Sequence, residues 1–132
     1  MTAQKNATVL LAHGSSDANW LAPFNDLLIR IRSGLDTQRV ELAYMELAHP
    51  SMEDQIRQLA TEGFSKIDIL PLFFAAGRHL RKDVPGQLDT LKAALADRGT
   101  RVELILPPPV GLEPEVSSAI SNIVIRQVSA ES

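Results

Sequence analysis

The chain has 132 residues, of which 45% are hydrophobic and 22% are charged. These proportions are typical of one soluble globular domain and exclude a disordered or fibrous protein. Thirteen basic and sixteen acidic side chains give a formal net charge of -3, which argues against general binding to nucleic acid or to an anionic membrane. The absence of cysteine excludes disulfides, thiolate metal sites and cysteine-ligated iron-sulfur clusters.

The sequence contains no pattern for secretion or for insertion into a membrane. Residues 1–8 are polar, whereas a signal peptide needs an apolar run near the start. No later segment approaches the length of an apolar membrane span. We therefore expect a cytoplasmic protein without membrane contact, in which residues 1–132 form a single domain.

The first predicted unit is a strand followed by a helix. Residues 8–12 are apolar and rich in β-branched or branched side chains, which predicts a buried strand that ends at His13 and Gly14. An amphipathic helix follows, with Gly34 near its expected end. Its apolar stripe consists of Trp20, Phe24, Leu27, Leu28, Ile31 and Leu35.

The second unit repeats this order. Residues 39–47 predict a strand with Glu46 near its end. Ser51 is then suited to cap a helix, because the acidic residues Glu53 and Asp54 fall in its first turn. The buried stripe of this helix consists of Met52, Ile56, Leu59 and Ala60.

The last two units are shorter or less regular. Residues 67–74 predict a third strand, in which Pro71 lacks a backbone donor and should occupy an irregular or edge position. A third helix follows, with Pro85 in its first turn and Gly99 beyond its end. Residues 101–106 predict a fourth strand. The apolar stripes of the third and fourth helices consist of Val84, Leu88, Leu91 and Leu95, and of Val116, Ile120, Ile123 and Val124.

Four strands that alternate with four helices predict an α/β fold, a small doubly wound parallel sheet of about four strands with helices on both faces. Such sheets bind ligands beyond the carboxyl ends of their strands. His13 and His79 follow two different predicted strands, and Glu46 lies near the end of a third. We therefore expect all three at this edge of the sheet.

Two imidazoles and a carboxylate suit a divalent ion such as Co²⁺, Fe²⁺, Ni²⁺ or Zn²⁺, and a neutral imidazole can also accept a proton. Two of these residues have a structural alternative: His13 could cap the helix that follows, and Glu46 could pair with a nearby cation. His49 precedes Pro50, so a role in shaping the turn is the better interpretation for it.

Residues 70–83 read L-P-L-F-F-A-A-G-R-H-L-R-K-D and place three cations beside His79. Arg78, Arg81 and Lys82 could form an ordinary solvated surface. Their crowding next to a glycine and a histidine instead favours a site for carboxylate or phosphate groups.

Three motifs carry a resemblance to a known family. The chain contains L-L-A-H-G-S, then M-E-L-A-x-P-S, then P-L-F-x-x-x-G-R-H-x-x-x-D-x-P, each at a strand-to-helix junction. In this order they resemble the CbiX/SirB family of sirohydrochlorin chelatases, in its short, single-domain, class II form. The resemblance implies a chelatase-like, flavodoxin-like fold that inserts Co²⁺, or Fe²⁺ or Ni²⁺, into sirohydrochlorin during cobalamin or siroheme biosynthesis.

The same resemblance implies roles for individual residues. His13 would be the proton acceptor and a metal ligand, and His79 the second metal ligand. Contacts to the macrocycle would come from Glu46, Phe74, Ala75, Ala76, Gly77 and Arg78. The metal is a substrate, so no permanently bound cofactor is implied. Since longer relatives contain two such domains, a homodimer is expected.

One feature departs from the family pattern. Many relatives read H-G-S-R, whereas Ser16 stands at the arginine position here. One cation expected at the substrate rim is therefore missing.

Three other functions are weighed against this one. In the main alternative, the protein has the same fold but is a non-catalytic paralogue that binds a tetrapyrrole or a metal. A phosphate-handling enzyme with His13 as nucleophile is disfavoured, because Ala12 stands where an arginine would help to hold the phosphate. A flavodoxin- or receiver-like module is disfavoured too, because the first loop lacks a phosphate cradle or an acidic cluster.

Overall fold

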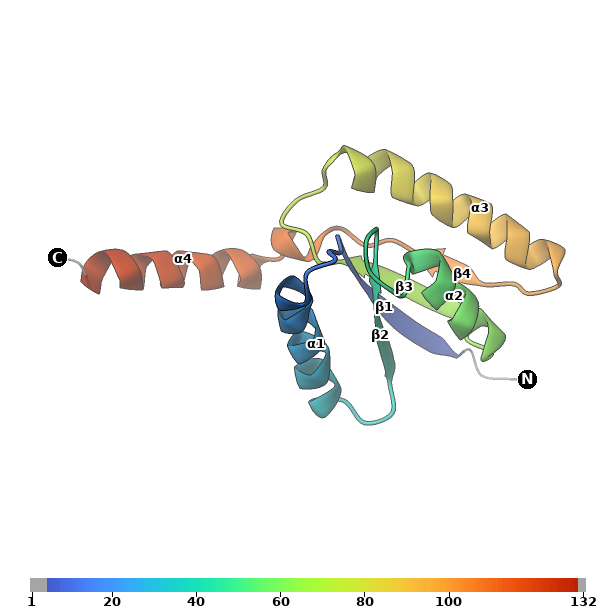
Figure 1. Ribbon diagram of the computed structural model, residues 1–132, viewed down its shortest axis with the longest axis horizontal. Helices are drawn as coiled ribbons and strands as arrows, with labels where there is room; N and C mark the ends of the chain where they lie inside the picture. The colour runs from blue at the N-terminus through green and yellow to red at the C-terminus, as the bar shows by residue number, and fades with distance from the viewer. Residues whose placement is uncertain (1–4, 131–132) are drawn as a thin grey trace.

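The protein is described by a computed structural model, which covers residues 5–130 with the exception of the His79 side chain. Its centre is a four-stranded parallel sheet with the strand order β2-β1-β3-β4 (Figure 1). The strands are β1 (Asn6–Ala12), β2 (Arg39–Tyr44), β3 (Lys66–Pro71) and β4 (Glu103–Ile105). The helices are α1 (Ala18–Ser33), α2 (Met52–Thr61), α3 (Val84–Asp97) and α4 (Pro114–Ala130), with the short helices η1 (His79–Asp83) and η2 (Val110–Leu112).

Helices lie on both faces of the sheet, so the predicted fold class is confirmed (Figure 1). The step from β1 to β2 runs in one direction across the sheet, and the steps to β3 and β4 run in the other. Right-handed crossovers therefore place α1 on one face and both α2 and α3 on the opposite face. Among residues 5–130, no helix combines the length and the apolar composition that crossing a membrane requires.

The main hydrophobic core lies between the sheet and the α2/α3 layer. Val9, Leu11, Ile67 and Ile69 are completely or almost completely buried there. The helical side chains above them are those of the predicted stripes, including Ile56, Leu59, Leu88, Leu91 and Leu95. Burial of these branched side chains supplies most of the driving force for this layer.

The other face of the sheet has a thinner layer. Leu10, Val40 and Leu42 are buried beneath α1, but no residue of α1 is itself buried. Leu70 and Leu72 on the same face stay partly exposed. The helix α4 does not cover them, because it extends away from the sheet (Figure 1).

Several helix ends match the predictions from local sequence. The Ser51 hydroxyl accepts a hydrogen bond from the backbone N–H of Asp54, 3.1 Å away, and so caps α2. Gly34 follows the last residue of α1, and Pro85 lies in the first turn of α3. These positions were predictable because each depends on only a few neighbouring residues.

The predicted strands 39–47, 67–74 and 101–106 are each too long. The strand β2 ends at Tyr44, and Leu47 has a φ of 62°, which is incompatible with an extended strand. The strand β3 ends at Pro71, beyond the last residue that pairs with β4. The missing donor of Pro71 therefore falls where β3 has no neighbour on the β4 side, as predicted for an irregular position.

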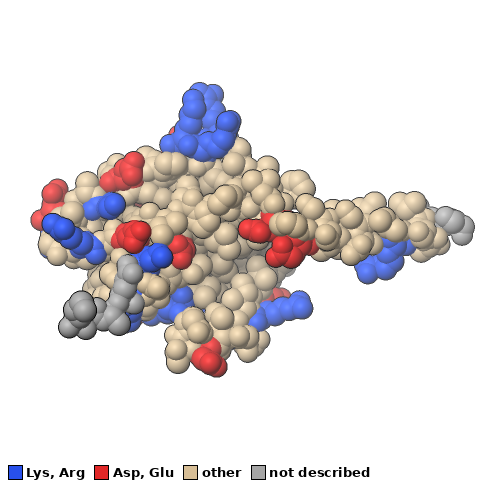
Figure 2. Space-filling view, turned by 180° about the vertical axis from the view of Figure 1, so that it is seen from behind, with Lys and Arg blue, Asp and Glu red and all other residues tan. Residues whose placement is uncertain are grey.

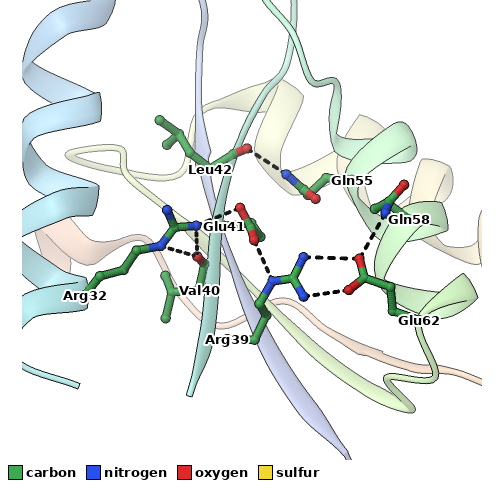
Figure 3. Close-up of polar contacts among 8 residues, drawn as sticks. All are labelled: Arg32, Arg39, Val40, Glu41, Leu42, Gln55, Gln58 and Glu62. Atoms are coloured by element: carbon green, nitrogen blue, oxygen red, sulfur yellow. Dashed lines mark hydrogen bonds and ion pairs between the residues drawn. The ribbon is translucent and has the colours of Figure 1, made fainter. Parts of the chain in front are cut away.

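A network of charged side chains connects the amino-terminal end of β2 to α1 and to the end of α2 (Figure 3). Arg39 contacts both carboxylate oxygens of Glu62, at 2.7 and 3.1 Å, and also contacts Glu41. Arg32 of α1 donates to the carbonyl of Val40 and to Glu41. The hydrogen bond from Arg39 lowers the pKa of Glu62. This network lies at the opposite end of the strands from His13, so we assign it a structural role.

Candidate active site at the carboxyl ends of the strands

His13 follows β1 directly and stacks on a core aromatic side chain. The parallel register pairs Leu11 with Pro71, and two residues further along it brings His13 beside Phe73. The two ring centroids are 4.1 Å apart and the rings are inclined by 19°. Phe73 is buried, whereas His13 is exposed. One face of the imidazole is thus held by the core while the residue remains accessible from solvent.

Glu46 follows β2 and lies next to His13 at the carboxyl edge of the sheet, as predicted. Its backbone N–H donates to the carbonyl oxygen of His13 at 3.0 Å, and the N–H of Met45 donates to Ala12 at 2.9 Å. The Glu46 side chain is exposed. Among the described residues, no three potential metal-binding side chains gather at one point. The substrate contact of Glu46 therefore stays a prediction.

Gly14 allows the ends of β1 and β2 to lie this close together. Its φ is 102°, and a Cβ atom added there would lie 1.8 Å from the carbonyl oxygen of Glu46. Any other residue would have to displace that backbone. The glycine after His13 is therefore required by the geometry of the site.

The loop after β3 forms an exposed apolar surface at this edge. Phe74 is 67% exposed, and Ala75 and Gly77 are exposed as well. Gly111 of η2 supports the loop: its N–H donates to the carbonyl of Phe73 at 2.9 Å, and an added Cβ would lie 2.1 Å from the Phe74 carbonyl oxygen. The Phe74 side chain is therefore presented outward from a firmly supported backbone.

His79 is the first residue of η1, a π-helical turn that leads into α3. The N–H of Arg81 donates to the carbonyl of Gly77 at 3.1 Å within this segment. Turns of this type are frequent at functional sites. The His79 side chain lies outside the described part of the structure, so its role as second metal ligand stays a prediction.

Arg78, Arg81 and Lys82 are all exposed. Figure 2 shows basic side chains projecting from the surface over the start of α3. Their long side chains can reach anionic groups bound at the adjacent edge. The cluster thus fits the predicted binding of a carboxylate-bearing ligand.

One more histidine, His49, and one tyrosine, Tyr44, lie at or just after the carboxyl end of β2. His49 is exposed and precedes Pro50, whose carbonyl accepts the backbone N–H of Tyr44 at 2.9 Å. Burial raises the pKa of Tyr44, so its phenol stays neutral.

A groove of about 630 Å³ lies between α2 and α3, with Met45 in its lining. His13 does not line this groove, although its stacking partner Phe73 belongs to the core beneath α2 and α3.

Sequence reasoning missed three residues of the site: Phe73, Leu47 and Gly111. It selected Phe74 but not Phe73, although extending the strand register from Leu11 and Pro71 would have placed Phe73 beside His13. Leu47 is 70% exposed because its left-handed backbone turns it out of β2. Only the three-dimensional fold brings Gly111 beneath the loop.

A model of one protein family, CbiX, matches residues 7–127. The chain belongs to the CbiX family. The match covers both the strand ends that carry His13 and Glu46 and the loop that leads to His79.

Curated relatives of similar length support this assignment. The chain is 28% identical over 116 residues to a sirohydrochlorin cobaltochelatase of Sulfurisphaera tokodaii, covering 88% of each chain. It is 24% identical over 125 residues to a protein of the same name from Sulfolobus acidocaldarius, covering 93% of each chain.

Solved structures support the fold. A cobalamin (vitamin B12) biosynthesis CbiX protein from Marinobacter aquaeolei VT8 is 36% identical, with a TM-score of 0.79 over 97% of this chain and 98% of that one. The sirohydrochlorin chelatase SirB from Bacillus subtilis subspecies spizizenii, solved with cobalt, is 20% identical and has a TM-score of 0.74. The match covers 90% of this chain but 49% of SirB, so this CbiX chain corresponds to about half of that fold.

Proposed function

We propose that this protein is a sirohydrochlorin chelatase that inserts Co²⁺, or Fe²⁺ or Ni²⁺, into the macrocycle, with His13 as proton acceptor and metal ligand. The observation that carries the proposal is the His13 imidazole, stacked on Phe73 at the carboxyl edge of the sheet, in a chain of the CbiX family. Relatives that match most of this chain are named sirohydrochlorin cobaltochelatases.

The chemistry of the reaction explains why a histidine is needed. Two pyrrole N–H bonds break, two protons leave, and the metal forms bonds to the nitrogens of the macrocycle without any change in oxidation state. A neutral imidazole can accept these protons near pH 7 and pass them to solvent. Because His13 is exposed on one side and held on the other, its lone pair can be presented to a substrate in a fixed orientation.

His79 is proposed as the second metal ligand. Imidazole binds Co²⁺, Fe²⁺ and Ni²⁺ while leaving them exchangeable, whereas thiolates hold such ions more firmly. The metal is therefore a substrate that the two histidines deliver, and the chain needs no resident cofactor for this step.

The surroundings of His13 fit a flat, acidic macrocycle. The exposed ring of Phe74 supplies an apolar surface, and Glu46, Ala75, Ala76 and Gly77 are the other proposed contacts. Sirohydrochlorin bears many carboxylates, which Arg78, together with Arg81 and Lys82, would bind by charge-assisted hydrogen bonds. This arrangement orients the ring without enclosing it.

An open edge contacts such a ring from one side only. We propose a homodimer, in which a second copy supplies the other side of the cleft. A closed two-fold assembly is the commonest form for identical chains.

The test is metal insertion by the purified protein. Sirohydrochlorin is mixed with Co²⁺, Fe²⁺ or Ni²⁺ in separate reactions, and the absorption change is compared with the spontaneous rate. The proposal predicts acceleration with at least one of these ions. Tight binding of sirohydrochlorin without acceleration by any of them would instead identify a tetrapyrrole-binding paralogue.

A further inference from the structure

Leu47 combines two features that an apolar residue seldom has together. Its φ of 62° is left-handed, and among the described residues only glycines otherwise have positive φ values. Its side chain is also 70% exposed. A left-handed backbone is unfavourable for a branched side chain, whereas glycine adopts it without strain. Neither the backbone conformation nor burial therefore accounts for a leucine at this position.

The backbone of Leu47 lies directly beside the candidate site. The preceding residue, Glu46, donates its N–H to the carbonyl oxygen of His13 at 3.0 Å. The carbonyl group of Glu46, which forms the peptide bond to Leu47, packs against Gly14 so closely that a Cβ there would lie 1.8 Å from its oxygen. Leu47 thus begins at a peptide group that is held against the residue after His13.

Phe74 has a corresponding position on the other side of His13. The strand order β2-β1-β3 places the end of β1, and hence His13, between the other two strand ends. Leu47 follows β2 and Phe74 follows β3, and both side chains are mostly exposed. Neighbouring strands are about 4.8 Å apart, so the two outer strand ends are about 10 Å apart. This spacing is comparable with the width of one tetrapyrrole ring.

An exposed apolar side chain needs no explanation by itself. Ile29 of α1 is 65% exposed in an ordinary helical conformation. Leu47 differs from Ile29 in two respects, because its backbone is strained and because it lies at the edge of the sheet that carries His13. Strained residues gather at sites that bind ligands, where the strain is tolerated for the sake of a contact.

We propose that Leu47 contacts the substrate and, together with Phe74, supports the apolar face of the tetrapyrrole so that the centre of the ring lies over His13. This inference rests on the proposed chelatase function and adds a residue that selects the macrocycle. Contact with ring carbons supplies affinity that does not depend on the carboxylates of the substrate. Support on two sides also holds the ring nitrogens close to the imidazole that accepts their protons.

The first test measures binding of sirohydrochlorin without metal, by fluorescence titration. Loss of the contact in Leu47→Ala should raise Kd about 5-fold to 30-fold, which corresponds to part of the burial of one leucine side chain. Leu47→Met keeps an apolar side chain and should stay within about 2-fold of the unmodified chain. Ile29→Ala is the matched control and should leave Kd unchanged.

The outcomes separate this inference from the proposed function. If the unmodified chain binds sirohydrochlorin and Leu47→Ala binds it equally well, the role of Leu47 is overturned while the chelatase proposal stands. An unmodified chain that does not bind sirohydrochlorin would overturn both.

Salt distinguishes an apolar contact from an ionic one. High salt weakens the attraction of Arg81 and Lys82 for carboxylates, but it does not screen contacts between apolar groups. The ratio of Kd between Leu47→Ala and the unmodified chain should therefore be the same at low and at high salt. A ratio that falls toward one as salt rises would contradict an apolar contact of Leu47.

Replacement by glycine tests whether the side chain serves binding or the fold. Leu47→Gly relieves the left-handed strain, so its urea midpoint should equal or exceed that of the unmodified chain, while Kd rises at least as much as in Leu47→Ala. Ile29→Gly should lower the midpoint, because glycine is unfavourable within a helix. A clearly lower midpoint for Leu47→Gly would show that the side chain supports the fold, and would overturn the proposal.

A second copy of the chain is the other partner that an exposed leucine could contact. Molar mass is measured by light scattering for the unmodified chain and for Leu47→Ala, both without substrate. The two values should be equal if Leu47 contacts the macrocycle. A lower molar mass for Leu47→Ala would place Leu47 between two copies and would overturn the proposal.

Discussion

The imidazole of His13 lies flat against the ring of Phe73, with centroids 4.1 Å apart and an inclination of 19°. The contact joins the residue after β1 to a residue two positions after β3, which are neighbouring strands of the sheet. Because Phe73 is buried and His13 is exposed, the core fixes the orientation of a side chain that faces solvent.

Replacing Phe73 with leucine should therefore slow metal insertion while keeping most of the core volume. An aromatic pair contributes about 0.5–1.5 kcal/mol beyond simple burial, so we expect kcat to fall between about 2-fold and 10-fold. Phe64→Leu is the matched control, since Phe64 is also buried but contacts Lys5 and Arg39 at the far end of the sheet. Equal rates for both variants would argue against a positioning role of Phe73.

Gly14 and Gly86 should respond to alanine in opposite directions. At Gly14 the new Cβ would meet the Glu46 carbonyl at a positive φ, so we expect a loss of about 2 kcal/mol or more in unfolding free energy. At Gly86, within α3, nothing lies within 4 Å of the added atom. Alanine there should raise stability by about 0.5–1 kcal/mol. Urea denaturation measures both, and a stable Gly14→Ala variant would contradict the geometry at the site.

Removing both Arg81 and Lys82 should weaken substrate binding more than it slows chemistry. An exposed ion pair contributes up to about 1 kcal/mol, so Arg81→Ala combined with Lys82→Ala should raise KM for sirohydrochlorin between about 3-fold and 30-fold. The effect should shrink at high salt because these contacts are exposed. Arg101→Ala serves as control, since Arg101 is also exposed but precedes β4 at the opposite end of the strands. A fall in kcat at unchanged KM would point to a different role.

Glu62 should contribute to stability at neutral pH and lose that contribution in acid. Hydrogen bonds from Arg39, and next from Gln58, lower the pKa of Glu62 from its ordinary value of 4.5. A carboxyl group with a lowered folded-state pKa stabilises the fold above its unfolded pKa, and this contribution disappears as pH falls through the folded value. The stability difference between the unmodified chain and Glu62→Gln should therefore be small and constant near pH 7 and should disappear as pH falls below 4.5 and through the lowered folded-state pKa. A difference that persists at pH 2 would contradict this account.

The elements that the sequence predicted correctly depend on local rules. Ser51 caps α2 because its hydroxyl reaches an N–H three residues away, and the stripe beginning at Val84 is buried because helical spacing alone places it on one face. Strand ends were harder to predict. Leu47 reads as one more apolar strand residue, but its φ of 62° is left-handed and takes the chain out of the extended conformation.

The position of α4 could not be predicted for a related reason. The stripe from Val116 to Val124 predicts a helix, and the helix exists. Amphipathic spacing does not say which surface the stripe contacts, and within the described chain no residue of α4 is buried. At the site, the motifs identified His13 and Glu46 at adjacent strand ends, but the partner of the His13 ring follows only from the strand register.

The initial rate of metal insertion by His13→Ala is the most direct test of the central proposal. A positioned proton acceptor contributes about 10²- to 10⁴-fold, so the rate should fall by at least about 100-fold toward the spontaneous value, with unchanged circular dichroism. His49→Ala, which changes an exposed histidine two residues before Ser51, the N-cap of α2, should retain nearly the full rate. A His13→Ala variant as active as His49→Ala would contradict the assignment of His13 as the catalytic base.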